Sequence, residues 1–116
     1  MRWTGGASVP LRGFGMCNLT RPFASLEISA GRAGLTVRPA LFTRRLPGYP
    51  WVLAPTQPHV AFPVRATGFQ RGVGFEIVGA RPYYFWCGRS QAGVLDALQE
   101  AGFTVDRTER RPRYRK

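Results

Sequence analysis

The chain has 116 residues and carries 17 Lys and Arg against 6 Asp and Glu, which gives a formal net charge of +11. Its length suits one domain, and its 44% hydrophobic and 13% aromatic residues exclude a disordered chain. The 14 Gly and 10 Pro residues exclude an all-helical bundle and favour short strands joined by turns.

The first third of the chain contains one clear strand pattern. Residues 1–17 are rich in glycine and show no hydrophobic period, so we expect a flexible N-terminal arm there, with a short edge strand over 8–14 as the alternative. Apolar and polar residues alternate over 23–29 and again over 34–38, on either side of a glycine-containing turn. This pattern predicts a β-hairpin. Residues 40–46 are predicted to form a third short strand.

Further strands are predicted in the middle of the chain. Residues 51–53 and 60–66 are apolar but lie among prolines, so we expect edge strands, because proline cannot donate a ladder hydrogen bond. Alternating apolar residues over 73–77 predict a strand, and the aromatic run 83–87 predicts another. Phe85 and one flanking aromatic are expected in the core, with Trp86 partly exposed or beneath a helix.

The hydrophobic period then changes to that of a helix. Val94, Leu95 and Leu98 share one helical face, which predicts a helix over 91–101 with Ser90 as N-cap. Gly102 suits the position just after its end. Residues 107–116 hold six basic side chains and one acid and show no apolar period, so residues 106–116 are expected to form a disordered basic tail.

Catalytic and metal-binding patterns are missing from the sequence. Cys17, Cys87 and His59 are widely separated, so no metal site and no cofactor is expected. The six acids are scattered and the single histidine has no neighbouring partner, so we expect no enzyme. No secretory leader is visible, which predicts a cytoplasmic protein with two free thiols.

A family resemblance rests on four sets of residues: 18–28 with 34–39, then 71–75, 85–87, and 94–98 with Gly102. In this order they resemble small bacterial, actinobacterial-type proteins with a pleckstrin-homology-like domain, over residues 18–105. The resemblance implies a mostly β (α+β) fold, a strongly bent antiparallel sheet or small barrel capped by one C-terminal helix. It implies no catalytic residues. Many such proteins look like scaffolds, often membrane-associated or self-assembling. The prolines within 51–64 depart from the pattern.

The arginine excess has two interpretations. It reflects either a GC-rich genome or a surface for an anionic partner, a lipid surface or nucleic acid. The internal set Arg38, Arg44, Arg45, Arg65 and Arg71 is either such a patch or a set of solvated edge charges. The residues expected to bind an anionic surface are Arg44, Arg45, Arg110, Arg111, Arg113, Arg115 and Lys116.

The sequence thus predicts a non-enzymatic interaction or scaffold module. It would attach peripherally to an anionic surface, such as the inner face of a membrane. The alternative is a small basic nucleic-acid-binding protein, because residues 71–78 partly match an RNA-binding strand. In that motif Phe75 would be exposed for stacking, whereas we expect it in the core. A protein partner or a second copy remains open, since Asp96 and Glu100 form an acidic stripe on the helix. No transmembrane segment is predicted.

Overall fold

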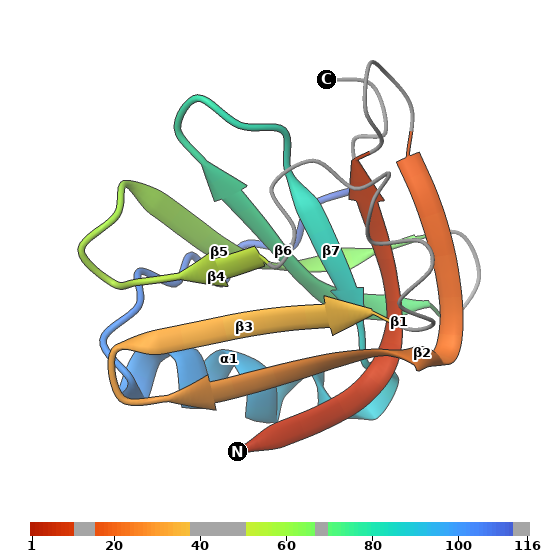
Figure 1. Cartoon of the computed structure of the whole chain (residues 1–116), viewed down its shortest axis with the longest axis horizontal. Coiled ribbons are helices and arrows are strands. Elements are labelled where there is room, and N and C mark those ends of the chain that lie inside the picture. The colour runs from red at the N-terminus through yellow and green to blue at the C-terminus, as the bar shows by residue number, and fades with distance from the viewer. Residues whose placement is uncertain (11–15, 38–50, 67–69, 113–116) are drawn as a thin grey trace.

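The structure is a computed structural model that describes residues 1–10, 16–37, 51–66 and 70–112. Within these residues, seven antiparallel strands form one sheet in the order β4-β3-β2-β1-β7-β6-β5, and one α-helix follows them (Figure 1). The predicted mostly β fold with a C-terminal helix is confirmed. The elements are β1 Arg2–Pro10, β2 Met16–Ser29, β3 Arg32–Val37, β4 Trp51–Leu53, β5 His59–Arg65, β6 Arg71–Ile77, β7 Tyr83–Trp86 and α1 Gln91–Glu100.

The sheet is a meander whose first strand also pairs with its last. β1 lies at the centre, between β2 and β7, and the described strands leave β4 and β5 as the two edges. One hydrophobic core takes residues from both halves of the sheet, so the sheet curves round it. The described strands do not close into a barrel, which corrects that part of the prediction.

Strand β1 replaces most of the flexible arm that was expected over residues 1–17. Its last six residues are buried, and it pairs with two neighbours. The glycines explain why the hydrophobic pattern of these residues gave no clear strand prediction. A Cβ on Gly5 would overlap the carbonyl oxygen of Trp86, so the close approach of β7 requires glycine there. A strand built from such small residues shows little hydrophobic alternation.

The remaining strand predictions agree with the structure where it describes them. The hairpin pairs Ala24 with Val37 and Ser29 with Arg32, and it turns at Ala30 and Gly31. Among the described strands, β4 and β5 are the two at the ends of the sheet order, which agrees with the edge positions that their prolines predicted. The strands predicted over 73–77 and 83–87 are β6 and β7. The strand predicted over 40–46 lies outside the described residues.

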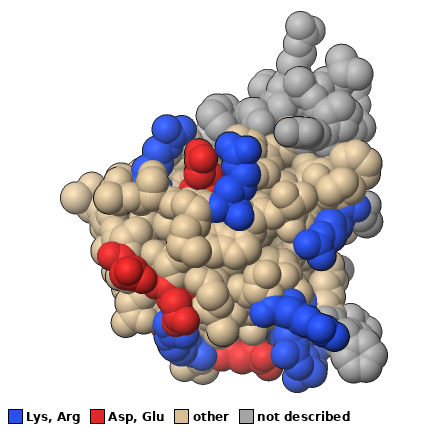
Figure 2. Space-filling model, turned by 90° about the horizontal axis from the view of Figure 1, so that it is seen from below, with Lys and Arg blue, Asp and Glu red and all other residues tan. Residues whose placement is uncertain are grey.

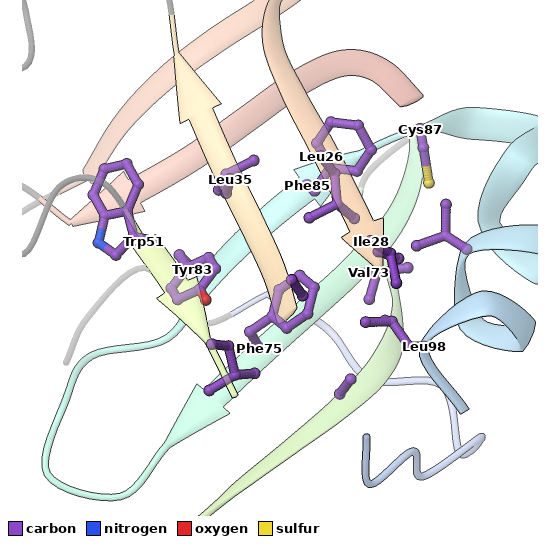
Figure 3. Packing of buried hydrophobic residues seen from close by; sticks show 14 of the residues in the cluster. Leu26, Ile28, Leu35, Trp51, Val73, Phe75, Tyr83, Phe85, Cys87 and Leu98 are labelled. Carbon is purple, nitrogen blue, oxygen red and sulfur yellow. The ribbon is translucent and has the colours of Figure 1, made fainter. Parts of the chain in front are cut away.

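The main core lies between the curved sheet and α1 (Figure 3). The rings of Phe75 and Tyr83 stack with centroids 5.1 Å apart, and Trp51 lies 5.8 Å from Tyr83. Phe75 is therefore a core residue, as expected. Helix α1 buries Val94, Leu95 and Leu98 against the sheet, which an isolated ten-residue helix would need for stability.

The end of α1 forms a Schellman motif. Gly102 has a φ of +95°, its N–H donates to the carbonyl of Gln99, and the N–H of Phe103 donates to that of Leu98. This confirms the predicted position of Gly102. Ser90 occupies the N-cap position, but its side chain makes no capping hydrogen bond.

A second, smaller apolar cluster lies on the opposite face of β5, β6 and β7. It consists of Phe62, Val64, Tyr84 and Trp86. A Cβ on Gly74 would overlap the ring of Phe62, so only glycine at this position leaves room for that ring to pack over β6. All four aromatics of the run 83–86 are buried. Trp86, which was expected to be partly exposed or beneath a helix, lies in this second cluster.

The C-terminal segment lies along the free edge of β5. Val105 pairs in parallel with Ala61, and Arg110 with Val64. The N–H of Arg110 donates to the carbonyl of Pro63, so this segment satisfies part of the edge that β5 would otherwise expose. Residues 106–112 are therefore an ordered part of the fold and not the disordered tail that their charge suggested.

Candidate anion-binding surface

The structure describes only two of the seven predicted anion-binding residues. Arg110 and Arg111 lie in the described C-terminal segment. The other five lie outside the described residues: Arg44, Arg45, Arg113, Arg115 and Lys116.

Arg110 is engaged within the chain itself. Its guanidinium lies 3.2 Å from Asp106 Oδ2 and 3.6 Å from Glu76 Oε1. Its Cζ also lies 4.2 Å from the centroid of the Phe62 ring, a cation–π contact. Arg110 thus fastens the C-terminal segment to β5 and β6, and it is not the freely available phosphate contact that the sequence suggested.

Two other arginines are brought together where β5 ends and β6 begins. Arg65 and Arg71 are directly opposite partners in the register of these strands, so their side chains lie on the same face of the sheet. The N–H of Ala66 donates to the carbonyl of Gln70, which closes the connection between the strands. The sequence analysis had placed both arginines in a possible patch, without evidence that they meet.

The backbone segments that carry Arg89 and Arg111 lie next to Arg71 and Arg65. The N–H of Cys87 donates to the carbonyl of Arg71, and Arg89 follows two residues later. The N–H of Arg65 donates to the carbonyl of Arg110, directly before the exposed Arg111. We call Arg65, Arg71, Arg89 and Arg111 the basic end. Figure 2, a view of the molecule from below, shows blue Lys and Arg side chains at its lower right with a red acidic side chain beside them.

The described ion pairs do not involve the four arginines of the basic end. Arg2 pairs with Glu27 at 3.4 Å and Arg107 with Asp96 at 2.6 Å. The other two are the pairs of Arg110 with Asp106 and Glu76, next to Arg111 in the chain. Throughout the described ranges, no carboxylate lies within ion-pair distance of Arg65, Arg71, Arg89 or Arg111. The basic end therefore keeps its positive charge uncompensated by these residues.

Three carboxylates form ion pairs with arginines of the same chain. Glu27 pairs with Arg2 and Glu76 with Arg110. Asp96, one of the two residues of the acidic stripe considered for a second copy, pairs with Arg107. The Thr108 backbone N–H, together with Arg110, holds the pKa of Asp106 below its usual range.

The single histidine is a structural residue. His59 begins β5, and its Nδ1 lies 2.6 Å from the carbonyl oxygen of Gln57. Its Nε2 accepts the N–H of Thr104 at 2.9 Å. These two bonds define the tautomer with the proton on Nδ1, and the ring also meets Phe103 edge-on at 5.4 Å. His59 thus connects the start of β5 to the C-terminal segment at Phe103 and Thr104.

Cys87 is a small buried residue directly after β7. Burial raises the pKa of its thiol to about 12, so the thiolate is scarce at neutral pH. In the described part of the chain, no three His, Cys, Asp or Glu side chains lie close enough together to hold a metal ion.

Of this surface, sequence reasoning missed Arg89, which lies in a short 3-10 helix at Gly88–Ser90. A single arginine in a short connection carries no periodic signal. Comparison of the chain with known protein families, curated proteins and solved structures finds no match. No helix among the described residues is long and apolar enough to cross a membrane.

Proposed function

We propose that the chain is a non-enzymatic interaction module of pleckstrin-homology-like type that attaches peripherally to an anionic lipid surface through the basic end. The observation that carries the proposal is the pairing of Arg65 with Arg71. Like charges directly opposite each other destabilise a sheet. Two arginines at such a site are better explained by a partner that neutralises them.

The chemistry of the basic end suits phosphate groups. Each guanidinium offers a planar fork of N–H donors that matches two phosphate oxygens. Each basic residue near an anionic leaflet contributes about 1 kcal/mol to the free energy of membrane binding. Four such residues therefore give weak, reversible attachment. Further charges from Arg44, Arg45, Arg113, Arg115 and Lys116 would add to it.

The order of the strands supports the pleckstrin-homology-like part of the proposal. The resemblance implies a bent antiparallel sheet with one C-terminal helix. The described strands run as a meander in which β1 also pairs with β7, and α1 packs on the resulting core. A shared architecture does not fix function, so the argument for lipid attachment rests on the basic end.

Single-stranded nucleic acid is the alternative anionic partner. Such binding generally uses exposed aromatic rings on which bases stack. Phe75 and the run 83–86 are buried, so the aromatic residues singled out by the sequence offer no stacking platform. The described residues therefore favour a partner recognised by its phosphates alone.

Vesicle flotation at physiological salt tests the proposal. The full chain is freed of nucleic acid and mixed with vesicles of phosphatidylcholine, with or without phosphatidylserine. We expect flotation with the phosphatidylserine vesicles only. Substituting both Arg65→Gln and Arg71→Gln should lower the partition coefficient roughly thirtyfold, because two contributions of about 1 kcal/mol are lost.

The control is a double variant with the same net charge. Arg2→Gln with Arg32→Gln removes two positive charges from β1 and β3, outside the basic end. It should float nearly as well as the unchanged chain. Equal losses in the two double variants would show that net charge alone drives attachment. Failure to float, together with binding of a single-stranded oligonucleotide, would favour the alternative.

A further inference from the structure

A small pocket opens between β1, β2 and the end of β7, beside Gln70, and the proposed function does not use it. Its volume is about 370 Å³. Gly6, Ala7 and Leu19 form part of its wall, and its polar lining consists of Ser8, Asn18, Arg21, Gln70 and Trp86. None of the residues of the basic end lines it.

A directed chain of hydrogen bonds lies in the wall of this pocket. The Nε1–H of Trp86 donates to Ser8 Oγ at 2.8 Å. Ser8 Oγ in turn lies 2.5 Å from Asn18 Oδ1. An indole can only donate, so the Ser8 hydroxyl accepts from Trp86 and has its own proton left for Asn18. Ser8 is only 1% exposed, so this proton needs a partner within the protein.

This direction decides which group Asn18 offers to a ligand. Because Asn18 Oδ1 accepts the Ser8 proton, its Nδ2 carries two N–H donors that have no partner among the described residues. Arg21 adds a guanidinium, which has donors and no acceptor. Gln70 adds an amide. None of the described residues that line the pocket is a carboxylate, so the polar groups of this lining are mainly donors and its charge is positive.

We propose that this pocket binds one oxyanion, a carboxylate or phosphate group, with Arg21 as its counter-ion and Asn18 Nδ2 as a second donor. Charge-assisted hydrogen bonds of this kind are the strong ones. The proposal goes beyond surface attachment, because it concerns different residues and a single anionic group. The source of that group is either a free small molecule or a lipid headgroup.

The Trp86 indole is a built-in reporter. The chain has three tryptophans, so a ¹⁵N-labelled full chain should give three indole signals, which single Trp→Phe substitutions assign. The Trp86 signal senses the pocket through Ser8. The probes are inorganic phosphate, acetate, and phosphatidylserine vesicles added to the Arg65→Gln/Arg71→Gln variant. We expect a saturating shift of the Trp86 signal, while the Trp3 and Trp51 signals stay in place.

Two substitutions test the assigned donors. Arg21→Gln should weaken binding about tenfold, as expected for loss of a charged hydrogen-bond partner. Asn18→Asp keeps an oxygen acceptor for Ser8 but places a negative charge in the pocket, and it should abolish the shift. Arg32→Gln, which makes the same charge change outside the pocket, should bind like the unchanged chain. Circular dichroism establishes that each variant is folded.

The outcomes separate the two sources and the two proposals. A shift with free phosphate or acetate assigns a soluble ligand, and a shift with vesicles alone assigns a headgroup. Failure of every probe to move the Trp86 signal overturns the pocket proposal. An equal shift in Asn18→Asp overturns it as well. Neither result affects flotation through Arg65 and Arg71, so attachment and pocket binding can fail independently.

Discussion

The guanidinium of Arg110 lies over the ring of Phe62, with Cζ 4.2 Å from the ring centroid. This contact joins the C-terminal segment to the face of β5 that carries the second apolar cluster. The backbone bonds of the same segment reach Ala61, Pro63 and Arg65. The segment is therefore part of the sheet, and its positive charges are divided between structural contacts and the basic end.

Substituting Arg110→Ala should destabilise the fold. It removes the cation–π contact with Phe62 and the ion pairs with Glu76 and Asp106. Because the side chain is partly exposed, we expect a loss of about 1 kcal/mol in the free energy of unfolding, measured by urea denaturation. Arg111→Ala is the neighbouring control and should change stability by less than about 0.5 kcal/mol. An equal effect of both substitutions would refute the structural role of Arg110.

Gly74→Ala should cost about 2 kcal/mol or more, because the new Cβ would overlap the buried Phe62 ring. Gly34→Ala is the matched control in β3, where a Cβ would have no atom within 4 Å. It should be neutral or slightly stabilising. Thermal unfolding of the two variants measures both effects. Similar melting temperatures of the two variants would contradict the tight packing of Phe62 over Gly74 in the second apolar cluster.

The two glycines of the helical region should respond in opposite directions. Gly102→Ala places a Cβ at a φ of +95° and should cost about 1 kcal/mol. Gly93→Ala lies within α1, where nothing would contact the new Cβ, and should stabilise by about 1 kcal/mol. Chemical denaturation compares them. A gain in stability from Gly102→Ala would mean that the helix does not end in the Schellman motif.

The stability of the protein should fall at alkaline pH, partly because of Cys87. Burial raises the pKa of this thiol from 9.0 to about 12. Below pH 9 the thiol is neutral in both folded and unfolded chains, so its contribution is fully present. Between pH 9 and 12 the unfolded chain releases the proton first, and the contribution is lost.

Alkylation measures the same property directly. In a Cys17→Ser background at pH 9, iodoacetamide should modify Cys87 at least roughly tenfold more slowly in the folded protein than in urea, because the thiolate is the reacting species. Cys87→Ala should also lose less stability than the unchanged chain between pH 9 and 11. Equal alkylation rates in the folded and unfolded states would contradict the burial of this thiol.

The sequence was most informative where one face of an element is apolar and the other polar. The hairpin, β6 and α1 each show their period clearly, and the structure has them where they were predicted. Strand β1 escaped prediction because the close approach of β7 requires glycine at position 5, a contact between residues far apart in the chain. The C-terminal segment escaped because its pairing with β5 is made by backbone atoms, on which side-chain composition gives little information.

In the candidate surface, too, the sequence predicted what depends on composition and missed what depends on contacts between distant residues. Charge arithmetic correctly pointed to a basic protein, but it could not tell Arg110, which is bound to Asp106, from arginines without such partners. Strand register decides that Arg65 meets Arg71, and register depends on the whole hairpin of β5 and β6. The direction in which the Ser8 hydroxyl donates its hydrogen bond likewise depends on Trp86, which is 78 residues away in the chain.

The most direct test of the account is to map the contact surface by amide resonances of the ¹⁵N-labelled full chain. Phosphatidylserine-containing and pure phosphatidylcholine bicelles are compared. The account predicts that the anionic bicelles broaden the signals of Arg65, Arg71 and Arg89 and leave those of the β2–β3 hairpin unchanged, whereas neutral bicelles do neither. Broadening centred on the hairpin around Arg32, or none at all, would contradict it.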